Sequence, residues 1–166
     1  IYGEPEWRDP ELAARARDQG DAAALVQAWR SRGEKLFDVL HGPFAFAVGE
    51  ASGNRALVSV DRLGIQQMCF ANPGAGLVFA SDARAVAAHP AVGRTLSRQG
   101  LFNYLYFYVS PGPDTVFGGV RKLLAGQYAL LDSGRVETGF YWHPPFAEPE
   151  GADGASLERE VFECLE

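Results

Sequence analysis

The sequence has few of the residues that build disulfide frameworks or metal sites. Its 166 residues include two cysteines, Cys69 and Cys164, and three histidines. The two thiols lie far apart along the chain, and neither has a second thiol or a histidine at ligand spacing. We therefore expect a protein of a reducing compartment, the cytoplasm, with no metal site.

Long apolar runs and an excess of positive charge are also missing. The longest apolar stretches, residues 101–109 and 123–131, are about half as long as the ~20 residues that a bilayer span requires. The net charge is −6, but seven acidic residues and one basic residue fall within residues 148–166, so the rest of the chain is neutral. We expect neither a membrane nor a nucleic acid as a partner.

The residues that are present indicate one packed domain and part of a second. Hydrophobic residues make up 47% of the chain and charged residues 22%, so disorder is excluded. The chain starts at Ile1 without an initiator Met, and residues 156–166 begin a helical pattern without an end signal. We expect a piece of a longer protein, with a domain at 1–143, a linker at 144–155 and the first helix of a further domain at 156–166.

The N-terminal third is predicted to be mainly helical. A helix over residues 11–20 ends at Gly20, and Asp21 has the character of an N-cap for a helix at residues 22–32 that Gly33 ends. A short helix is expected at 34–40. Residues 41–43 are expected to form the turn where the pattern changes from helical to extended.

From Phe44 the pattern is extended. Residues 44–51 and 55–61 predict a hairpin, and strands at 67–71 and 77–80 would complete a four-stranded antiparallel meander.

Two helices and a second hairpin are predicted after it. The helices begin at Ser81 or Asp82 and at Ser97, and the hairpin consists of strands 127–132 and 135–141. In the second helix four apolar residues have the spacing of a buried face: Leu101, Phe102, Leu105 and Tyr106.

The common catalytic motifs do not occur in the sequence. The histidines are tens of residues apart, and no nucleophile elbow, zinc-protease or phosphate-loop pattern is present. Cys69 lies within a predicted strand, where a cysteine is usually buried and inert. The residues by themselves indicate an α+β domain and no reaction.

Several motifs in a fixed order indicate a resemblance to a known family. They are FDVLHGPFAFA at 37–47, VDRLGI at 60–65, GLVFASD at 76–82, AAHPAV at 87–92 and TVFGGVRKLLAGQY at 115–128. From Tyr2 to Trp142 the chain resembles the amino-terminal class II glutamine amidotransferase domain of glutamine-hydrolysing asparagine synthetases. The resemblance implies the four-layer αββα sandwich of N-terminal-nucleophile hydrolases, followed by an ATP-dependent synthetase domain.

In that family an N-terminal Cys attacks the side-chain amide of glutamine, its α-amino group is the base, and the ammonia passes to the synthetase domain. The resemblance implies no cofactor for this domain, and ATP and Mg²⁺ for the synthetase domain. Ile1 is not a nucleophile. We therefore expect the catalytic Cys, and the Arg that holds the glutamine carboxylate, to lie upstream, and the chain alone to be inactive.

The resemblance assigns substrate binding to Gly3, Glu4 and Asp21. The family has Asn-Gly-Glu where this chain has Tyr2-Gly3-Glu4, and the Asn side chain and Gly amide form the oxyanion hole. Gly3 is thus the expected oxyanion donor, and Tyr2 replaces the other one. Glu4 and Asp21 would hold the substrate ammonium, which needs a charged partner when it is desolvated.

Other interpretations of these residues remain open. Asp21 is also a good helix cap, and Gly3 and Glu4 also suit an ordinary strand end. The motif from Asp61 to Gly64 is expected to shape a turn rather than to contact substrate. The domain is then either the glutaminase of an asparagine-synthetase-like ligase, with glutamine, the synthetase domain and a second copy as candidate partners, or a non-catalytic scaffold on the same fold.

Overall fold

The computed structural model describes residues 1–74, 76–146 and 154–165. Its helices are α1 (Pro10–Gln19), α2 (Asp21–Arg32), the 3-10 helix η1 (Gly33–Asp38), α3 (Ala83–Ala87), α4 (Arg98–Phe107) and α5 (Gly154–Leu165). Its strands are β1 (Tyr2–Gly3), β2 (Glu6–Trp7), β3 (Leu40–His41), β4 (Phe44–Gly49), β5 (Arg55–Val60), β6 (Cys69–Ala71), β7 (Val78–Ala80), β8 (Arg121–Lys122), β9 (Gln127–Asp132) and β10 (Arg135–Phe140).

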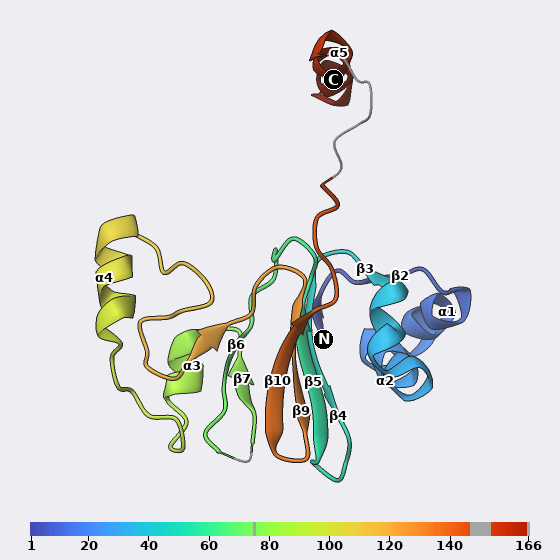
Figure 1. Cartoon of the computed structure of the whole chain (residues 1–166). Helices are drawn as coiled ribbons and strands as arrows, with labels where there is room; N and C mark the ends of the chain where they lie inside the picture. Colours follow the sequence, from blue (N-terminus) through green and yellow to red (C-terminus); the bar gives the residue numbers. More distant parts are fainter. Residues whose placement is uncertain (75, 147–153, 166) are drawn as a thin grey trace.

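Antiparallel sheets form the centre of the molecule (Figure 1). The largest has the strand order β1-β4-β5-β9-β10, β2 pairs with β3, and a third sheet has the order β7-β6-β8. Both predicted hairpins are confirmed, with Ala45 opposite Val60 in the first and Arg135 opposite Asp132 in the second. The predicted meander is wrong, because β9 occupies the edge of β5 that β6 would need.

Side chains on β4 alternate between two different cores. Phe44, Phe46 and Val48 pack toward η1 and α2, in a cluster with Leu25, Ala28, Trp29, Leu36 and Phe37. Ala45, on the opposite face, packs with Val58, Val60, Met68 and Phe70 against the sheet β7-β6-β8. Strand residues alternate in this way because successive side chains point to opposite faces.

A third cluster joins Cys69 and Ala71 to Val86 and Ala87 of α3. Figure 1 shows the resulting order, from α1 and α2 through the five-stranded sheet and the smaller sheet to α3. The expected α+β class with antiparallel sheets flanked by helices is therefore present.

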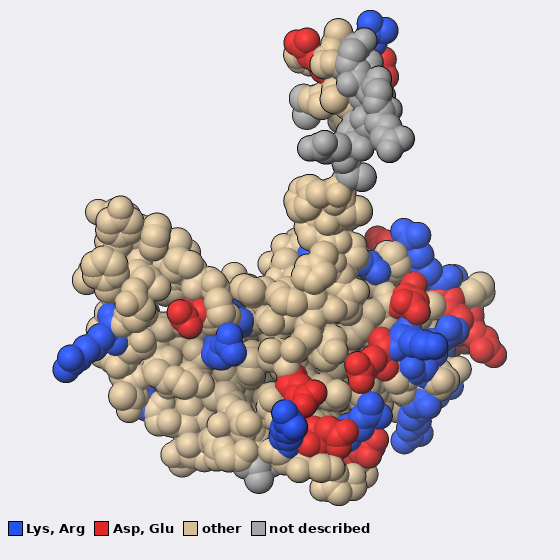
Figure 2. Space-filling view, viewed as in Figure 1, with Lys and Arg blue, Asp and Glu red and all other residues tan. Residues whose placement is uncertain are grey.

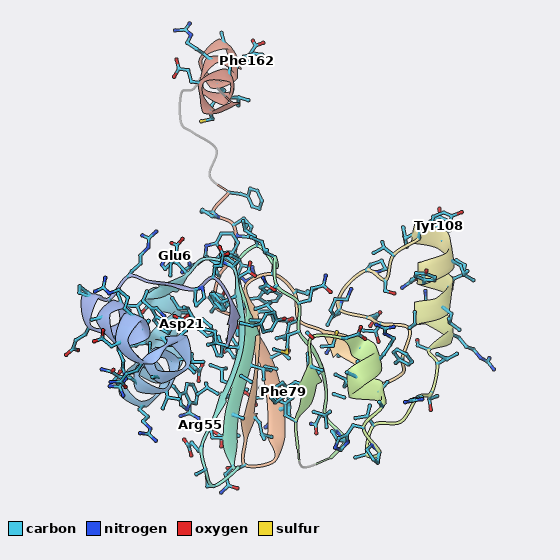
Figure 3. The ribbon with its side chains drawn as sticks, turned by 180° about the vertical axis from the view of Figure 1, so that it is seen from behind. Glu6, Asp21, Arg55, Phe79, Tyr108 and Phe162 are labelled. Atoms are coloured by element: carbon cyan, nitrogen blue, oxygen red, sulfur yellow. The ribbon has the colours of Figure 1, made fainter. Side chains whose placement is uncertain are left out.

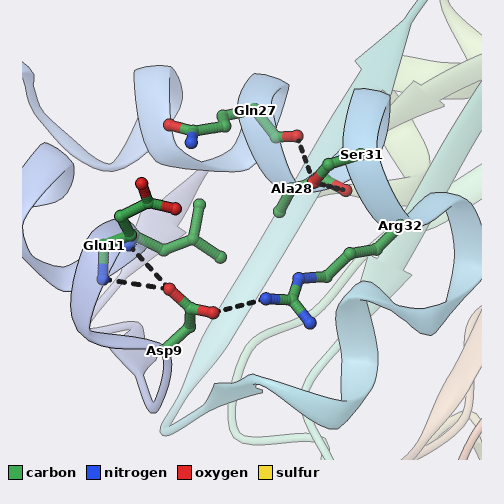
Figure 4. A network of polar contacts seen from close by, with 7 residues as sticks. Asp9, Glu11, Gln27, Ala28, Ser31 and Arg32 are labelled. Carbon is green, nitrogen blue, oxygen red and sulfur yellow. Dashed lines mark hydrogen bonds and ion pairs between the residues drawn. The ribbon is translucent and has the colours of Figure 1, made fainter.

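Helix ends follow the local signals closely. Asp9 accepts hydrogen bonds from the backbone amides of Glu11 and Leu12, at 3.0 and 3.1 Å, and pairs with Arg32 at the end of α2 (Figure 4). Asp82 and Ser97 cap α3 and α4, as expected. These bonds satisfy backbone amides that have no partner within the helix.

The expectations for Asp21 and for residues 34–43 need correction. Gly20, with φ +86°, is the N-cap of α2, and Asp21 is the first helical residue and makes no capping bond. The short helix expected at 34–40 is the 3-10 helix η1, which ends at Asp38. His41 belongs to β3 rather than to a turn, because β2 offers it a pairing partner at Glu6.

The apolar face expected to be buried on α4 is exposed. Leu101, Phe102, Leu105 and Tyr106 are 37%, 59%, 71% and 68% exposed. The helix is anchored at its first turn, where Gly100 lies so close to Thr115 that a Cβ would be 2.1 Å from the Thr115 carbonyl oxygen. The apolar spacing thus predicted the helix correctly, whereas the expected burial of its apolar face was wrong.

The C-terminal part of the chain is described only in part. Helix α5 spans Gly154–Leu165, and residues 147–153 of the expected linker lie outside the described residues. Among the described helices none combines the length and apolarity needed to cross a bilayer.

Asp61 organises the loop that follows β5. It is 1% exposed, and its carboxylate accepts hydrogen bonds from the backbone amides of Leu63, Ile65 and Gln66 at 3.0, 3.0 and 2.8 Å. Its own backbone oxygen accepts from the amide of Gly126 at 2.9 Å. The motif thus shapes a turn, as expected, but not a hairpin turn, because β5 and β6 lie in different sheets.

We predict that Asp61→Asn lowers the free energy of unfolding by about 2 kcal/mol, because hydrogen bonds to a charged acceptor contribute roughly 1.5–3 kcal/mol each. The Asn amide would place an N–H group against a backbone N–H group. Urea denaturation measures the change. The exposed Asp18 makes a matched control, and an Asp18→Asn effect as large as that of Asp61→Asn would contradict the assignment.

Candidate functional site

Gly3 occupies a position that only glycine fits. It has φ +100°, and a Cβ there would lie 2.3 Å from the backbone oxygen of Pro43. It stands opposite Phe44, and the next amide, of Glu4, donates to the Pro43 oxygen at 2.8 Å. Because hydrogen-bonded and non-hydrogen-bonded pairs alternate in an antiparallel ladder, the Gly3 amide points away from β4. It therefore faces the outer edge of the sheet, where β1 is the last strand.

Asp21 is tied to the N-terminal segment by a tryptophan. Its Oδ1 accepts a hydrogen bond of 2.9 Å from Nε1 of Trp7, which lies three residues after Glu4. The pairing of Asp9 with Arg32 holds α1 against the end of α2 and so fixes the helix on which Asp21 stands. Figure 3 shows Asp21 and Glu6 on this same lobe of the molecule.

The three predicted binding residues are brought together only in part. The Trp7–Asp21 bond links Asp21 to the segment that carries Gly3 and Glu4, whereas Gly3 and Glu4 make no side-chain contact of this kind with α2 in the described part of the chain. Glu4 is exposed and Asp21 half-buried. Trp7 was missed by the sequence reasoning, although a partly buried indole N–H usually needs an acceptor.

Tyr2 makes a contact that occupies its hydroxyl group. The hydroxyl donates to the backbone oxygen of Gln67, and burial is the main cause that raises the pKa of Tyr2. Gln67 lies between the VDRLGI motif and β6. The residue that replaces the expected Asn is thus in direct contact with the segment that leads into β6.

A cavity lies beside Tyr2, between the two larger sheets. Its volume is about 260 Å³, and its lining includes Ile1, Tyr2, Met68, Phe79 and Ser81. Gly3 and Glu4 do not line it. The side chain of Tyr2 therefore faces a different space from the carboxylate of Glu4.

The remaining nucleophile and base candidates are not arranged for catalysis. Cys69 is 3% exposed, and burial raises the pKa of its thiol despite Lys122 directly opposite it on β8. Burial and the nearby Arg62 lower the pKa of His41, whose Nε2 lies 3.3 Å from the Arg62 guanidinium. Within the described residues no three His, Cys, Asp or Glu side chains gather as metal ligands.

Comparisons with known proteins show the family to which the chain belongs. The model of the glutamine amidotransferase domain matches residues 2–142. Asparagine synthetase (glutamine-hydrolyzing) 3 of Bacillus subtilis (strain 168) is 27% identical over 147 residues, which cover 86% of this chain and 24% of that protein.

Mycobacterial proteins provisionally named as glutamine-hydrolyzing asparagine synthetases show a similar match. Those of Mycobacterium tuberculosis (strain H37Rv) and Mycobacterium bovis are each 26% identical over 155 residues, or 89% of this chain and 24% of theirs. The chain thus spans about a quarter of the length of the curated relatives it matches. Because the family model covers most of the chain, this protein belongs to the glutamine amidotransferase domain family.

Proposed function

We propose that this domain supplies ammonia from glutamine to a synthetase domain of the same polypeptide, in an asparagine-synthetase-like enzyme of the cytoplasm. The main support is the orientation of the Gly3 amide, which points out from the sheet edge beside Glu4. The Trp7–Asp21 bond adds a second carboxylate on the same lobe. One backbone donor and two carboxylates suit an oxyanion and an ammonium group respectively.

We also propose the four-layer αββα architecture of N-terminal-nucleophile hydrolases. Its support is the presence of three separate apolar clusters, each filling one interface between successive layers. A cysteine at the N-terminus of the enzyme would attack the amide carbon of glutamine. The negative charge would form on the amide oxygen near the Gly3 N–H. The α-amino group would pass the thiol proton to the leaving nitrogen as the C–N bond breaks, which releases ammonia, and water would then hydrolyse the acyl-enzyme to glutamate. The ATP and Mg²⁺ implied for the synthetase domain take no part in these steps.

We predict that the 166-residue chain alone does not hydrolyse glutamine. Residue 1 is isoleucine, and the thiol of Cys69 is buried with a raised pKa. Ammonia release from glutamine by the purified chain, measured against a buffer blank, tests this. Release that persists in Cys69→Ala but disappears in Asp21→Asn would contradict the prediction and reveal another nucleophile.

Tyr2 is predicted to make the enzyme a poor glutaminase. Its hydroxyl already donates to Gln67 and is not aimed at an oxyanion beside Gly3. The loss of one oxyanion donor typically slows such a reaction by about a hundredfold to a thousandfold. In the protein with a terminal cysteine, Tyr2→Asn should therefore raise the glutamine-dependent rate by at least about tenfold and leave the ammonia-dependent rate unchanged.

Tyr2→Phe is the matched control for this substitution. It removes the bond to Gln67 without adding an amide donor, so it should leave the glutamine-dependent rate low. Equal gains in both variants would show that the Gln67 contact, rather than the missing donor, limits the reaction. A parent enzyme that uses glutamine as well as ammonia would overturn the role of Tyr2.

A further inference from the structure

A second cavity lies at the opposite end of α2 from Asp21. Its volume is about 360 Å³, and it lies between the last turns of α2 and the tip of the β4–β5 hairpin. Its lining consists of Val26, Trp29, Arg30, Val48, Gly49, Glu50, Ala51 and Arg55. Trp29 lies eight residues after Asp21, or roughly 12 Å along the helix axis, so this cavity is separate from the proposed glutaminase site.

Arg55 is held in place at the wall of this cavity. Its guanidinium carbon lies 4.8 Å from the centroid of the Trp29 ring, a cation–π contact that holds the group against α2. Figure 3 shows Arg55 on the side of the hairpin that faces α1 and α2. The guanidinium is therefore positioned before any ligand arrives.

The Nε atom of Arg55 is buried and has no hydrogen-bond partner among the described residues. A buried N–H group without an acceptor is unfavourable, and such groups are rare in folded proteins. Nη2, on the same edge of the guanidinium, lies 3.6 Å from Oε1 of Glu34, which is too long for a hydrogen bond. Both side chains of that pair are more than a third exposed, so the contact is weak.

The edge formed by Nε and Nη2 is one of the two that bind a carboxylate through parallel hydrogen bonds. Arg30 lies in the same lining and has no carboxylate within 4.0 Å in the described chain. Two arginines against Glu50 leave one net positive charge in the lining. Figure 2 shows that charged side chains gather over this side of the molecule, whereas the surface over α4 has few.

We propose that this cavity binds the carboxylate of a small organic acid. The carboxylate would accept from Nε and Nη2 of Arg55, and the rest of the acid would lie against the lining between α2 and the β4–β5 hairpin. Glu50 and the nearby Glu34 together offset the charges of Arg30 and Arg55, so they disfavour a dianion more than a monoanion.

The test observes the orphaned Nε directly. In the ¹⁵N-labelled chain, the Arg55 Nε–H resonance is assigned by its loss in Arg55→Lys, and 4-methylpentanoate is then titrated at millimolar concentrations. We expect a saturable downfield shift of that proton, and no shift with the neutral 4-methylpentanamide. The Trp29 indole resonance should titrate with the same apparent Kd.

Substitutions then distinguish the paired N–H groups of Arg55 from its positive charge. Arg55→Lys should weaken binding at least about tenfold, because lysine keeps the charge but does not present two parallel N–H groups. Arg135→Lys changes an exposed arginine that pairs with Glu137, and should leave the Kd unchanged. If Arg55→Lys does not fold, the Nε–H resonance is assigned in the parent chain by through-bond correlation to the Arg55 backbone, and its shift decides.

Three results would overturn the proposal. One is an Arg55 Nε–H resonance that does not move when the carboxylate is added. Another is equal binding by the parent and Arg55→Lys. The third is tighter binding of inorganic phosphate than of the carboxylate, which would show the wrong ligand class.

Discussion

The burial of β4 on both faces is the constraint from which the rest of the structure follows. Its large side chains, such as Phe44 and Phe46, fill the space under α2 and η1, and the small Ala45 lets the sheet β7-β6-β8 approach from the other side. The position of β4 also determines the residue on β1, because β1 lies so close to Pro43 that any side chain larger than that of Gly3 would collide with it. The direction of the Gly3 amide is thus a consequence of core packing.

The candidate site depends on contacts between segments that are distant in sequence. The hydrogen bond from Trp7 to Asp21 crosses from β2 to α2, and the bond from Tyr2 to Gln67 crosses from β1 to the segment before β6. The first holds a carboxylate beside the N-terminal segment. The second bond occupies the hydroxyl group of Tyr2, the residue that replaces the expected asparagine. The carboxylates are therefore available to a substrate ammonium, whereas the Tyr2 hydroxyl is not available to an oxyanion.

Local signals in the sequence were sufficient for helix ends and hairpins. Asp82, Ser97 and Gly33 end or begin helices through bonds within a few residues, so a pattern can predict them. Sheet membership was not predictable in this way, because the choice of β9 over β6 as the neighbour of β5 is a long-range pairing. For the same reason the exposure of α4 and the Trp7–Asp21 bond had no local signature.

The most direct measurement is an experimental structure of the enzyme that carries this domain, with glutamine bound. We expect the glutamine ammonium to lie within hydrogen-bond distance of both the Glu4 and the Asp21 carboxylates, with the amide oxygen toward the Gly3 N–H. A structure with Glu4 and Asp21 on opposite sides of the bound glutamine would contradict it. Asp21 would then be only the acceptor that holds Trp7 against α2.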